Sequence, residues 1–115
     1  MHVSSYEFGK LDVGDQAYTS DLIITPQRVE DSWWRKDGHQ LQIEDLSLIL
    51  AAEPQTLVVG TGYFGRMQIA AETKQYLQDH GITLIQEKTG EAVNLYNRLA
   101  EQNPDKVVAA FHLSC

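Results

Sequence analysis

The sequence predicts an α/β fold in which an N-terminal β-hairpin precedes a sheet with helices on both faces. Near the start of the chain, two strand-like segments flank a short Gly-Asp turn. The second half alternates short apolar runs with longer segments of helical character, in the order strand, helix, strand, helix, strand. Such alternation is typical of parallel strands whose connecting helices pack on both sides of the sheet.

The chain of 115 residues is long enough for one domain, which we expect to span 1–115. Acidic residues outnumber basic ones by 16 to 9, and no Lys and Arg cluster stands out. We therefore expect neither nucleic acid nor an anionic membrane surface as a partner. The single cysteine, Cys115, can form no internal disulfide, and no apolar run approaches the ~18 residues of a membrane helix. Together with an N-terminus that lacks signal character, these features predict a cytoplasmic protein.

The first third of the chain is predicted to form the hairpin and then an irregular segment. Residues 6–13 alternate loosely and residues 17–25 are strand-like, with the Gly-Asp turn between them. Pro26 ends the second strand because it cannot donate a hydrogen bond to a ladder. Residues 29–35 are predicted as an irregular segment or a short strand.

A helix is predicted over residues 43–52. Leu46, Ile49 and Leu50 would share one face of it, and Pro54 would end it. The acidic residues at its start suit the positive end of a helix dipole.

The stretch from 56 to 82 is the one around which the rest of the chain is organised. Leu57–Val59 is a short apolar run that suits a strand covered on both faces. A G-x-G-x-x-G spacing follows at residues 60–65, and glycine allows a sharp turn and a close approach of other groups. Residues 67–80 are good helix formers, and Gly81 provides a C-terminal stop. The predicted unit is a strand, a glycine turn and a helix.

The remaining elements complete the alternation. A strand is predicted over 82–86 and a helix over 90–102, with Thr89 as its N-terminal cap. Residues 107–113 form the last predicted buried strand.

The glycine turn suggests a ligand site, because free N–H groups at a helix N-terminus bind anions. One interpretation is a dinucleotide site, in which Glu87 at the end of the next strand meets a ribose hydroxyl. Against it, no second nucleotide-binding half follows. A second interpretation is a smaller anion or metabolite, with Arg66 reinforcing the site. A third is a tight turn that packs a helix on a strand without any ligand.

A second cluster contains Trp33, Trp34, Arg35 and His39. Neighbouring tryptophans beside an arginine are typical of binding surfaces. The alternative is that one tryptophan covers the edge of the core while Arg35 pairs with a carboxylate.

His112 and Cys115 are the remaining residues of chemical interest. A histidine can act as an acid–base group and a cysteine as a nucleophile or metal ligand, but neither has an evident third partner. A strand histidine hydrogen-bonded to backbone is the alternative. Since no Ser-His-Asp order, P-loop or paired-cysteine pattern is present, we predict no catalytic residues, no metal and no cofactor.

Six segments together resemble one small family of unknown function. They are YTSDLIITPQRV, WWRKDGHQL, the Glu-Asp-Leu of the first helix, VVGTGYFGRM, TGEAVNLYN and the closing AAFHLSC. The family is shared by bacterial proteins, the human adipogenesis-associated protein and the mitochondrial complex I assembly factor 3 group. The resemblance implies a single three-layer α/β domain with a central mixed sheet and an added β-hairpin, which replaces the all-parallel expectation. It also implies assembly or regulatory roles without an established reaction.

The resemblance leaves two hypotheses for function. The first is a non-enzymatic binding or assembly protein with a protein partner. This chain has no mitochondrial presequence, so a role in complex I assembly itself is not supported. The second is a protein, or minor enzyme, that binds a small anion or nucleotide at the Gly60–Gly65 turn. The residues expected to line a pocket are Thr61, Gly62, Gly65 and Arg66, with Trp34, Arg35, His39 and His112 as neighbours.

Overall fold

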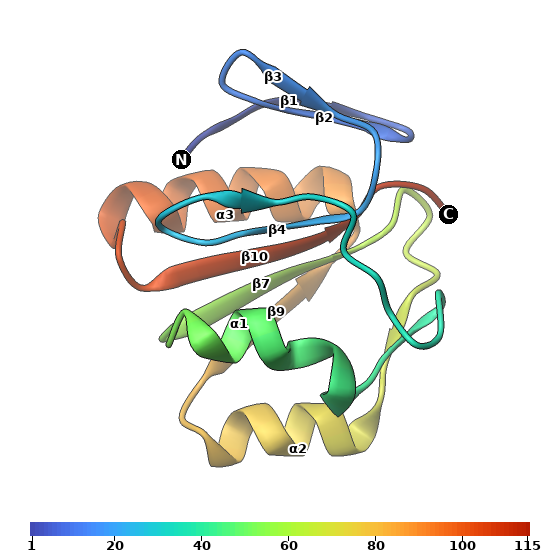
Figure 1. Cartoon of the computed structure of the whole chain (residues 1–115), viewed down its shortest axis with the longest axis vertical. Helices are drawn as coiled ribbons and strands as arrows, with labels where there is room; N and C mark the ends of the chain where they lie inside the picture. Colours follow the sequence, from blue (N-terminus) through green and yellow to red (C-terminus); the bar gives the residue numbers. More distant parts are fainter.

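The computed structural model describes all 115 residues, Met1–Cys115, as a five-stranded mixed sheet between helical layers, with a smaller antiparallel sheet beside it (Figure 1). The strand order of the central sheet is β5-β4-β10-β7-β9. Strands β10, β7 and β9 are parallel, whereas β4 runs antiparallel to β10 and to β5. The three-layer α/β fold, including the mixed sheet implied by the resemblance, is therefore confirmed. The central strands are β4 (Leu22–Ile24), β5 (Val29–Glu30), β7 (Thr56–Thr61), β9 (Thr83–Glu87) and β10 (Val107–His112).

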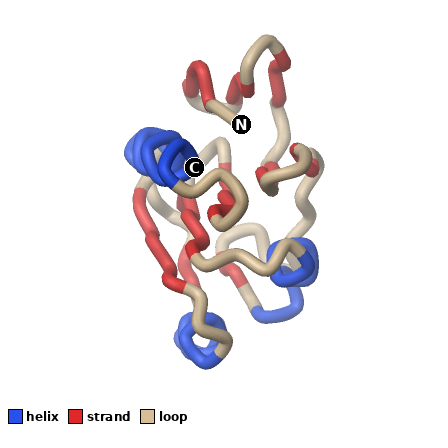
Figure 2. The backbone as a smooth tube through the Cα atoms, turned by 90° about the vertical axis from the view of Figure 1, so that its left-hand side faces the viewer, coloured by secondary structure: helices blue, strands red, loops and turns tan.

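The helices lie on both faces of this sheet. In Figure 1, α3 lies on one side and α1 and α2 lie on the other, and Figure 2 shows the same arrangement from the side. A 3-10 turn leads into α1, and a two-stranded parallel sheet, β6–β8, lies close to the start of α2. The elements are η1 (Ile43–Leu46), α1 (Ser47–Ala51), α2 (Ala71–Asp79), α3 (Thr89–Gln102), β6 (Gln40–Leu41) and β8 (Gln68–Ile69).

The alternation of side chains along β7 and β10 divides the core into two parts. Val58 and Phe111 face α3, where the ring of Phe111 meets the ring of Tyr96 edge-on, with centroids 5.9 Å apart. Leu57 and Val59 face the opposite way and pack with residues of α1 and α2. All six residues of β10 are buried, which agrees with the predicted buried strand at the end of the chain.

The N-terminal prediction needs a correction. Residues 6–13 are not one strand, because the chain turns at Phe8-Gly9 and Gly9 adopts a φ of +76°. The Gly-Asp turn does join antiparallel strands, but the segment after β3 leaves the hairpin and enters the central sheet as β4. All three residues of β4 are buried, so it requires cover on both faces, which the hairpin does not provide. The outer sheet consists of β1 (Val3–Glu7), β2 (Lys10–Val13) and β3 (Gln16–Tyr18).

The outer sheet is attached to α3 by both apolar and polar contacts. Val3 and Leu11 join the part of the core that α3 covers. The amide of Asn97 on α3 accepts a bond from the N–H of Val3 (2.9 Å) and donates one to its carbonyl (2.9 Å). An amide can satisfy both backbone groups at once, so Asn97 substitutes here for a neighbouring strand.

The predicted start of the second helix was wrong. We expected the helix over 67–80, but α2 begins at Ala71 and β8 precedes it. Burial alternates over this segment, since Met67 and Ile69 are buried while Gln68 is exposed, and this period of two is a strand pattern. The glycine turn therefore does not lead directly into a helix N-terminus. Gly81, with a φ of +72°, follows α2 as the predicted stop.

Candidate functional site

The glycine turn is packed tightly against other parts of the chain. A Cβ atom on Gly60 would lie 2.7 Å from Oγ1 of Thr89 and 2.8 Å from the ring of Phe111. Gly62 adopts a φ of +109°, and a Cβ there would lie 2.5 Å from the carbonyl oxygen of Ser114 and 2.8 Å from Cδ2 of His112. These glycines therefore permit close packing of β7, α3 and the C-terminal segment.

Hydrogen bonds fix this loop to α3 and to β10. Oγ1 of Thr89 accepts a bond from the N–H of Gly62 (2.9 Å) and donates to the carbonyl of His112 (2.6 Å). The N–H of Thr89 donates in turn to the carbonyl of Gly62 (3.1 Å). Thr89 was predicted as a helix cap, but Lys88 holds that position, and the hydroxyl of Thr89 joins the loop to the last strand.

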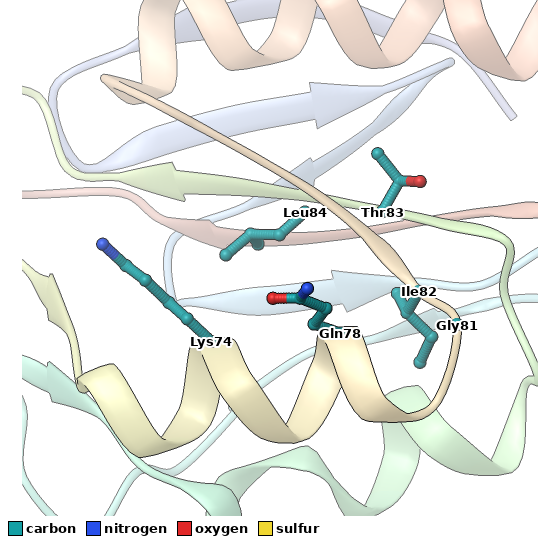
Figure 3. Close-up of a pocket in the computed structure, with 6 residues that line it drawn as sticks. All are labelled: Lys74, Gln78, Gly81, Ile82, Thr83 and Leu84. Atoms are coloured by element: carbon teal, nitrogen blue, oxygen red, sulfur yellow. The ribbon is translucent and has the colours of Figure 1, made fainter.

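The surface has five hollows, and none of them is lined by a residue of the glycine turn. One hollow of about 490 Å³ lies beside Trp34 and the start of α1. Another of about 490 Å³ lies between α2 and β9, as Figure 3 shows. The residues that line this second hollow are Lys74, Gln78, Gly81, Ile82, Thr83 and Leu84.

The same loop presents aromatic side chains to solvent. Phe8, Tyr63 and Phe64, which we call the aromatic patch, are 54%, 48% and 56% exposed. Their ring centroids lie 5.6 Å (Phe8–Tyr63), 5.0 Å (Tyr63–Phe64) and 6.1 Å (Phe8–Phe64) apart. Tyr6 adjoins Tyr63, and the guanidinium of Arg66 lies 5.6 Å from the ring centre of Phe64. The patch thus joins the hairpin turn to the glycine loop.

Behind the loop, three charged or polar side chains form a cluster that we call the polar cluster: Asp21, Arg35 and His112. One carboxylate oxygen of Asp21 lies 2.9 Å from Nη2 of Arg35 and 2.7 Å from Nδ1 of His112. The other accepts the N–H of Leu113 at 2.8 Å. Arg35 and His112 are 7% exposed, and Nη2 of Arg35 also donates to the carbonyl of Gly38 (2.9 Å).

The polar cluster is charge-paired, but not all of its hydrogen-bonding groups have partners. Burial by itself would raise the pKa of Asp21, but hydrogen bonds from His112 and Leu113 and the nearby charge of Arg35 hold that pKa below its ordinary value. Arg35 also lies over the ring of Trp33, at 4.8 Å from its centre. Nε and Nη1 of Arg35 and Nε2 of His112 are buried without a hydrogen-bond partner among the protein atoms.

The predicted pocket residues are thus divided among different environments. Gly62 contacts His112, and His112 contacts Arg35, so these three come together. Trp34 is 77% exposed, whereas its neighbour Trp33 is buried in the core, as the alternative interpretation expected of one tryptophan. The side chains predicted to line a pocket but not brought into one lie as follows: Thr61 is buried with its hydroxyl on the carbonyl of Glu87, Gly65 adjoins Lys88, and Arg66 and His39 are exposed.

Sequence reasoning missed Asp21 and all three residues of the aromatic patch. Asp21 supplies the carboxylate that the alternative interpretation of Arg35 requires. Its position just before the buried run of β4 was the available signal, because strand ends often carry the polar groups of a site. No group of three or more His, Cys, Asp or Glu side chains is arranged to hold a metal ion. None of the helices has the length and apolar character required to cross a membrane.

Comparison with known proteins places this chain and its fold among related chains. A family model described as a protein of unknown function (DUF498/DUF598) matches residues 3–112. Hypothetical protein PH1505 from Pyrococcus horikoshii OT3 is 26% identical over 100% of both chains, with a TM-score of 0.79. A protein from Bordetella parapertussis is 23% identical, covering 98% of this chain and 95% of that chain, with a TM-score of 0.82. A Bordetella pertussis protein described as a Mth938-like domain is 19% identical, covering 97% of this chain and 85% of that chain, with a TM-score of 0.70.

Proposed function

We propose that this chain, which belongs to the DUF498/DUF598 family of proteins of unknown function, as its motifs predicted, is a non-enzymatic protein-binding module of one domain. The observation that carries the proposal is the aromatic patch. Three neighbouring aromatic side chains on one surface each leave about half of their area exposed to solvent. The assembly or regulatory role that the resemblance implies is one use of such a module.

The chemistry of the patch favours a protein partner over a small ligand. Tyr, Phe and Arg are enriched at protein interfaces, where rigid rings contribute a large contact area at a low cost in side-chain entropy. Tyr63 and Phe64 lie on a loop that two hydrogen bonds between Gly62 and Thr89 fix to α3, so the surface is ordered before binding. Preorganisation of this kind lowers the entropic cost of association. The patch also has no enclosed hollow for a small molecule.

Site-specific photo-crosslinking in the native host tests this proposal. A photoreactive phenylalanine at position 63 is expected to trap one partner reproducibly. The same group at Gln102, an exposed position at the end of α3, is expected to trap none. The yield at position 63 should fall when Phe8 and Phe64 are replaced by serine. Equal patterns from positions 63 and 102 would contradict the proposal.

Binding of a small anion remains the second candidate, because a specific observation favours it. Nε and Nη1 of Arg35 are N–H donors that are buried without partners in the cluster behind the Gly60–Gly65 turn. Buried polar groups are normally satisfied, and a bound anion or water supplies what protein atoms do not. Thr61, Gly62, Gly65 and Arg66 would then border the approach to the cluster, and an anion would enter only after local opening of this segment.

Thermal unfolding with phosphate, sulfate, small carboxylates and nucleotides tests the second candidate. A ligand of the native state raises the melting temperature in a saturable way. The rise should disappear in Arg35→Gln and persist in Arg98→Gln, a control arginine on α3. An unchanged melting temperature with every compound would eliminate this candidate and leave the protein-binding proposal unaffected.

A further inference from the structure

The outer edge of β9 is an open strand edge of the central sheet. β9 is last in the strand order and pairs only with β7. The N–H of Thr83 donates toward β7, to the carbonyl of Gln55 (2.9 Å). Since successive peptide groups of a strand point to opposite sides, the N–H and C=O groups of Leu84 and Gln86 point away from β7. No further strand lies there to receive them.

The opposite edge of the sheet is protected in a way that β9 is not. β5 is only two residues long, and its Glu30 forms an ion pair with Arg28, which directly precedes the strand. Short length and charge are two ways in which proteins protect a sheet edge. β9 pairs over five residues without a bulge and contains no proline. It is therefore the edge on which another strand could be added.

The side chains along β9 also lack cover. Leu84 faces α2 and Ile85 faces α3, and each remains partly exposed although it packs against one of the two core clusters. Beside Leu84 lies the hollow of about 490 Å³ that Lys74 and Gln78 line from α2 (Figure 3). A strand placed on this edge would cover both apolar side chains, one on each face, and would pass along the hollow.

The charged side chains beside β9 indicate which kind of side chain an added strand would carry. Lys74 beside the hollow and Lys88 just after β9 are exposed, and neither forms an ion pair within the chain. Glu87 at the end of β9 is also exposed and without an ion pair, so two cations stand against one carboxylate along this edge. Two unpaired lysines flanking one strand are notable in a chain of net charge -7. Their position favours an acidic side chain on the added strand. The same net charge would make two copies of this chain repel each other, and two half-buried apolar residues supply little area for a stable dimer.

We propose that β9 accepts an extended segment of another protein, added as a sixth strand, with an acidic side chain placed against Lys74 or Lys88. Backbone bonds to Leu84 and Gln86 would supply affinity, and the lysines would supply selectivity. The inference extends the proposed binding role to a second surface. It shares no residue with the aromatic patch, so the two proposals can fail separately.

Selection from a displayed library of random nine-residue peptides tests the inference. The full chain is immobilised, and the strongest peptide is then synthesised together with its scrambled counterpart. The selected peptides are expected to alternate β-branched and polar residues and to contain Asp or Glu. In amide NMR spectra, the synthetic peptide should shift the signals of Leu84 and Gln86 more than those of Tyr63 and Phe64. Failure to enrich any peptide, or shifts confined to the aromatic patch, would overturn the inference.

Two pairs of variants make the test specific to the strand edge. Gln86→Pro removes an N–H that points away from β7. The affinity for the peptide should therefore fall about tenfold, which corresponds to the loss of one backbone hydrogen bond. Gln86→Ala keeps this N–H and should change the affinity little. Lys74→Glu with Lys88→Glu should weaken the binding of an acidic peptide. Replacing the Asp or Glu of that peptide with Lys should then restore its binding to this double variant. This rescue keeps the test valid if Gln86→Pro lowers stability.

Three results would contradict the inference. One is peptide binding that is unaffected by both sets of variants. Another is a wild-type dimer in sedimentation that Gln86→Pro dissociates, which would assign the edge to a second copy. The third is peptide binding lost in Tyr63→Ser with Phe64→Ser but kept in Gln86→Pro, which would assign the peptide to the aromatic patch.

Discussion

The polar cluster and the aromatic patch lie on either side of one loop and reverse the usual distribution of side chains. Behind Gly62, Asp21, Arg35 and His112 bring charged and polar groups into the protein interior. In front of it, Tyr63 and its aromatic neighbours remain exposed to solvent. Burial of charge and exposure of aromatic rings both require an explanation, because each opposes folding when nothing compensates for it.

The difference lies in where the compensation is found. The polar cluster is largely compensated within the chain, since Asp21 pairs with both Arg35 and His112 and accepts the N–H of Leu113. The aromatic patch is less fully compensated within the chain, because its rings contact one another, Tyr6 and Arg66 and still remain about half exposed. We therefore infer that the cluster acts mainly on stability and that the patch acts mainly on binding. The predictions below test this division.

The largest effect is expected when the carboxylate of the polar cluster is removed. Asp21→Ala leaves the buried Arg35 without its charged partner, and breaking such a pair costs roughly 3–5 kcal/mol of unfolding free energy. Urea unfolding followed by circular dichroism measures this loss. Asp79→Ala removes an exposed carboxylate that is bonded only to Gln75, and should change stability by less than about 0.5 kcal/mol. Similar losses in both variants would show that the cluster does not stabilise the fold.

A somewhat smaller loss is expected at the loop that separates the two regions. Gly62→Ala places a Cβ 2.5 Å from the carbonyl of Ser114 at a φ of +109°, so strain and crowding together should cost roughly 2–4 kcal/mol. Gly90→Ala is the matched control, because nothing lies within 4 Å of a Cβ there and its φ is not positive. We expect it to be neutral or slightly stabilising in the same unfolding assay. A neutral Gly62→Ala would mean that this loop is not closely packed.

The pH dependence of stability should reveal the polar cluster again. The pKa of Asp21 is lower in the folded chain than its ordinary value of 3.8, so the unfolded chain binds a proton first as the pH falls. The contribution of Asp21 is therefore complete above the ordinary pKa and is lost as the pH falls through the folded-state pKa. Unfolding free energies measured between about pH 5 and pH 2 should decline more steeply for wild type than for Asp21→Asn. Parallel curves would contradict this assignment.

Local sequence patterns predicted most of the fold because burial and periodicity are local properties. The run Leu57–Val59, the alternation after it and the stop at Gly81 each correspond to an observed element. Two of the errors have a common physical origin. β4 leaves the hairpin, and β8 replaces the first turn of the expected helix, because tertiary pairing with β10 and β6 overrides local propensity.

The candidate site was less predictable because it depends on register between distant segments. Asp21 and His112 lie 91 residues apart and meet only because β4 pairs with β10. The glycine spacing attracted a ligand interpretation, whereas its observed contacts are with Thr89, Ser114 and His112. Tyr63 and Phe64 lay inside that motif and were not singled out, since nothing local distinguishes an exposed aromatic side chain from a buried one.

The smallest effect on stability is expected at the aromatic patch, and it separates the two regions most clearly. Tyr63→Ser with Phe64→Ser removes rings that are about half exposed, so the loss of unfolding free energy should stay below about 1 kcal/mol. Tyr96→Ser is the contrasting variant, because Tyr96 is 2% exposed against Phe111 and its truncation should cost roughly 3–5 kcal/mol. Crosslinking through a photoreactive residue at Phe8 should then be lost in the patch variant while the fold is retained. A patch variant that unfolds like Tyr96→Ser would mean that these rings support the fold, and the division between the two regions would no longer hold.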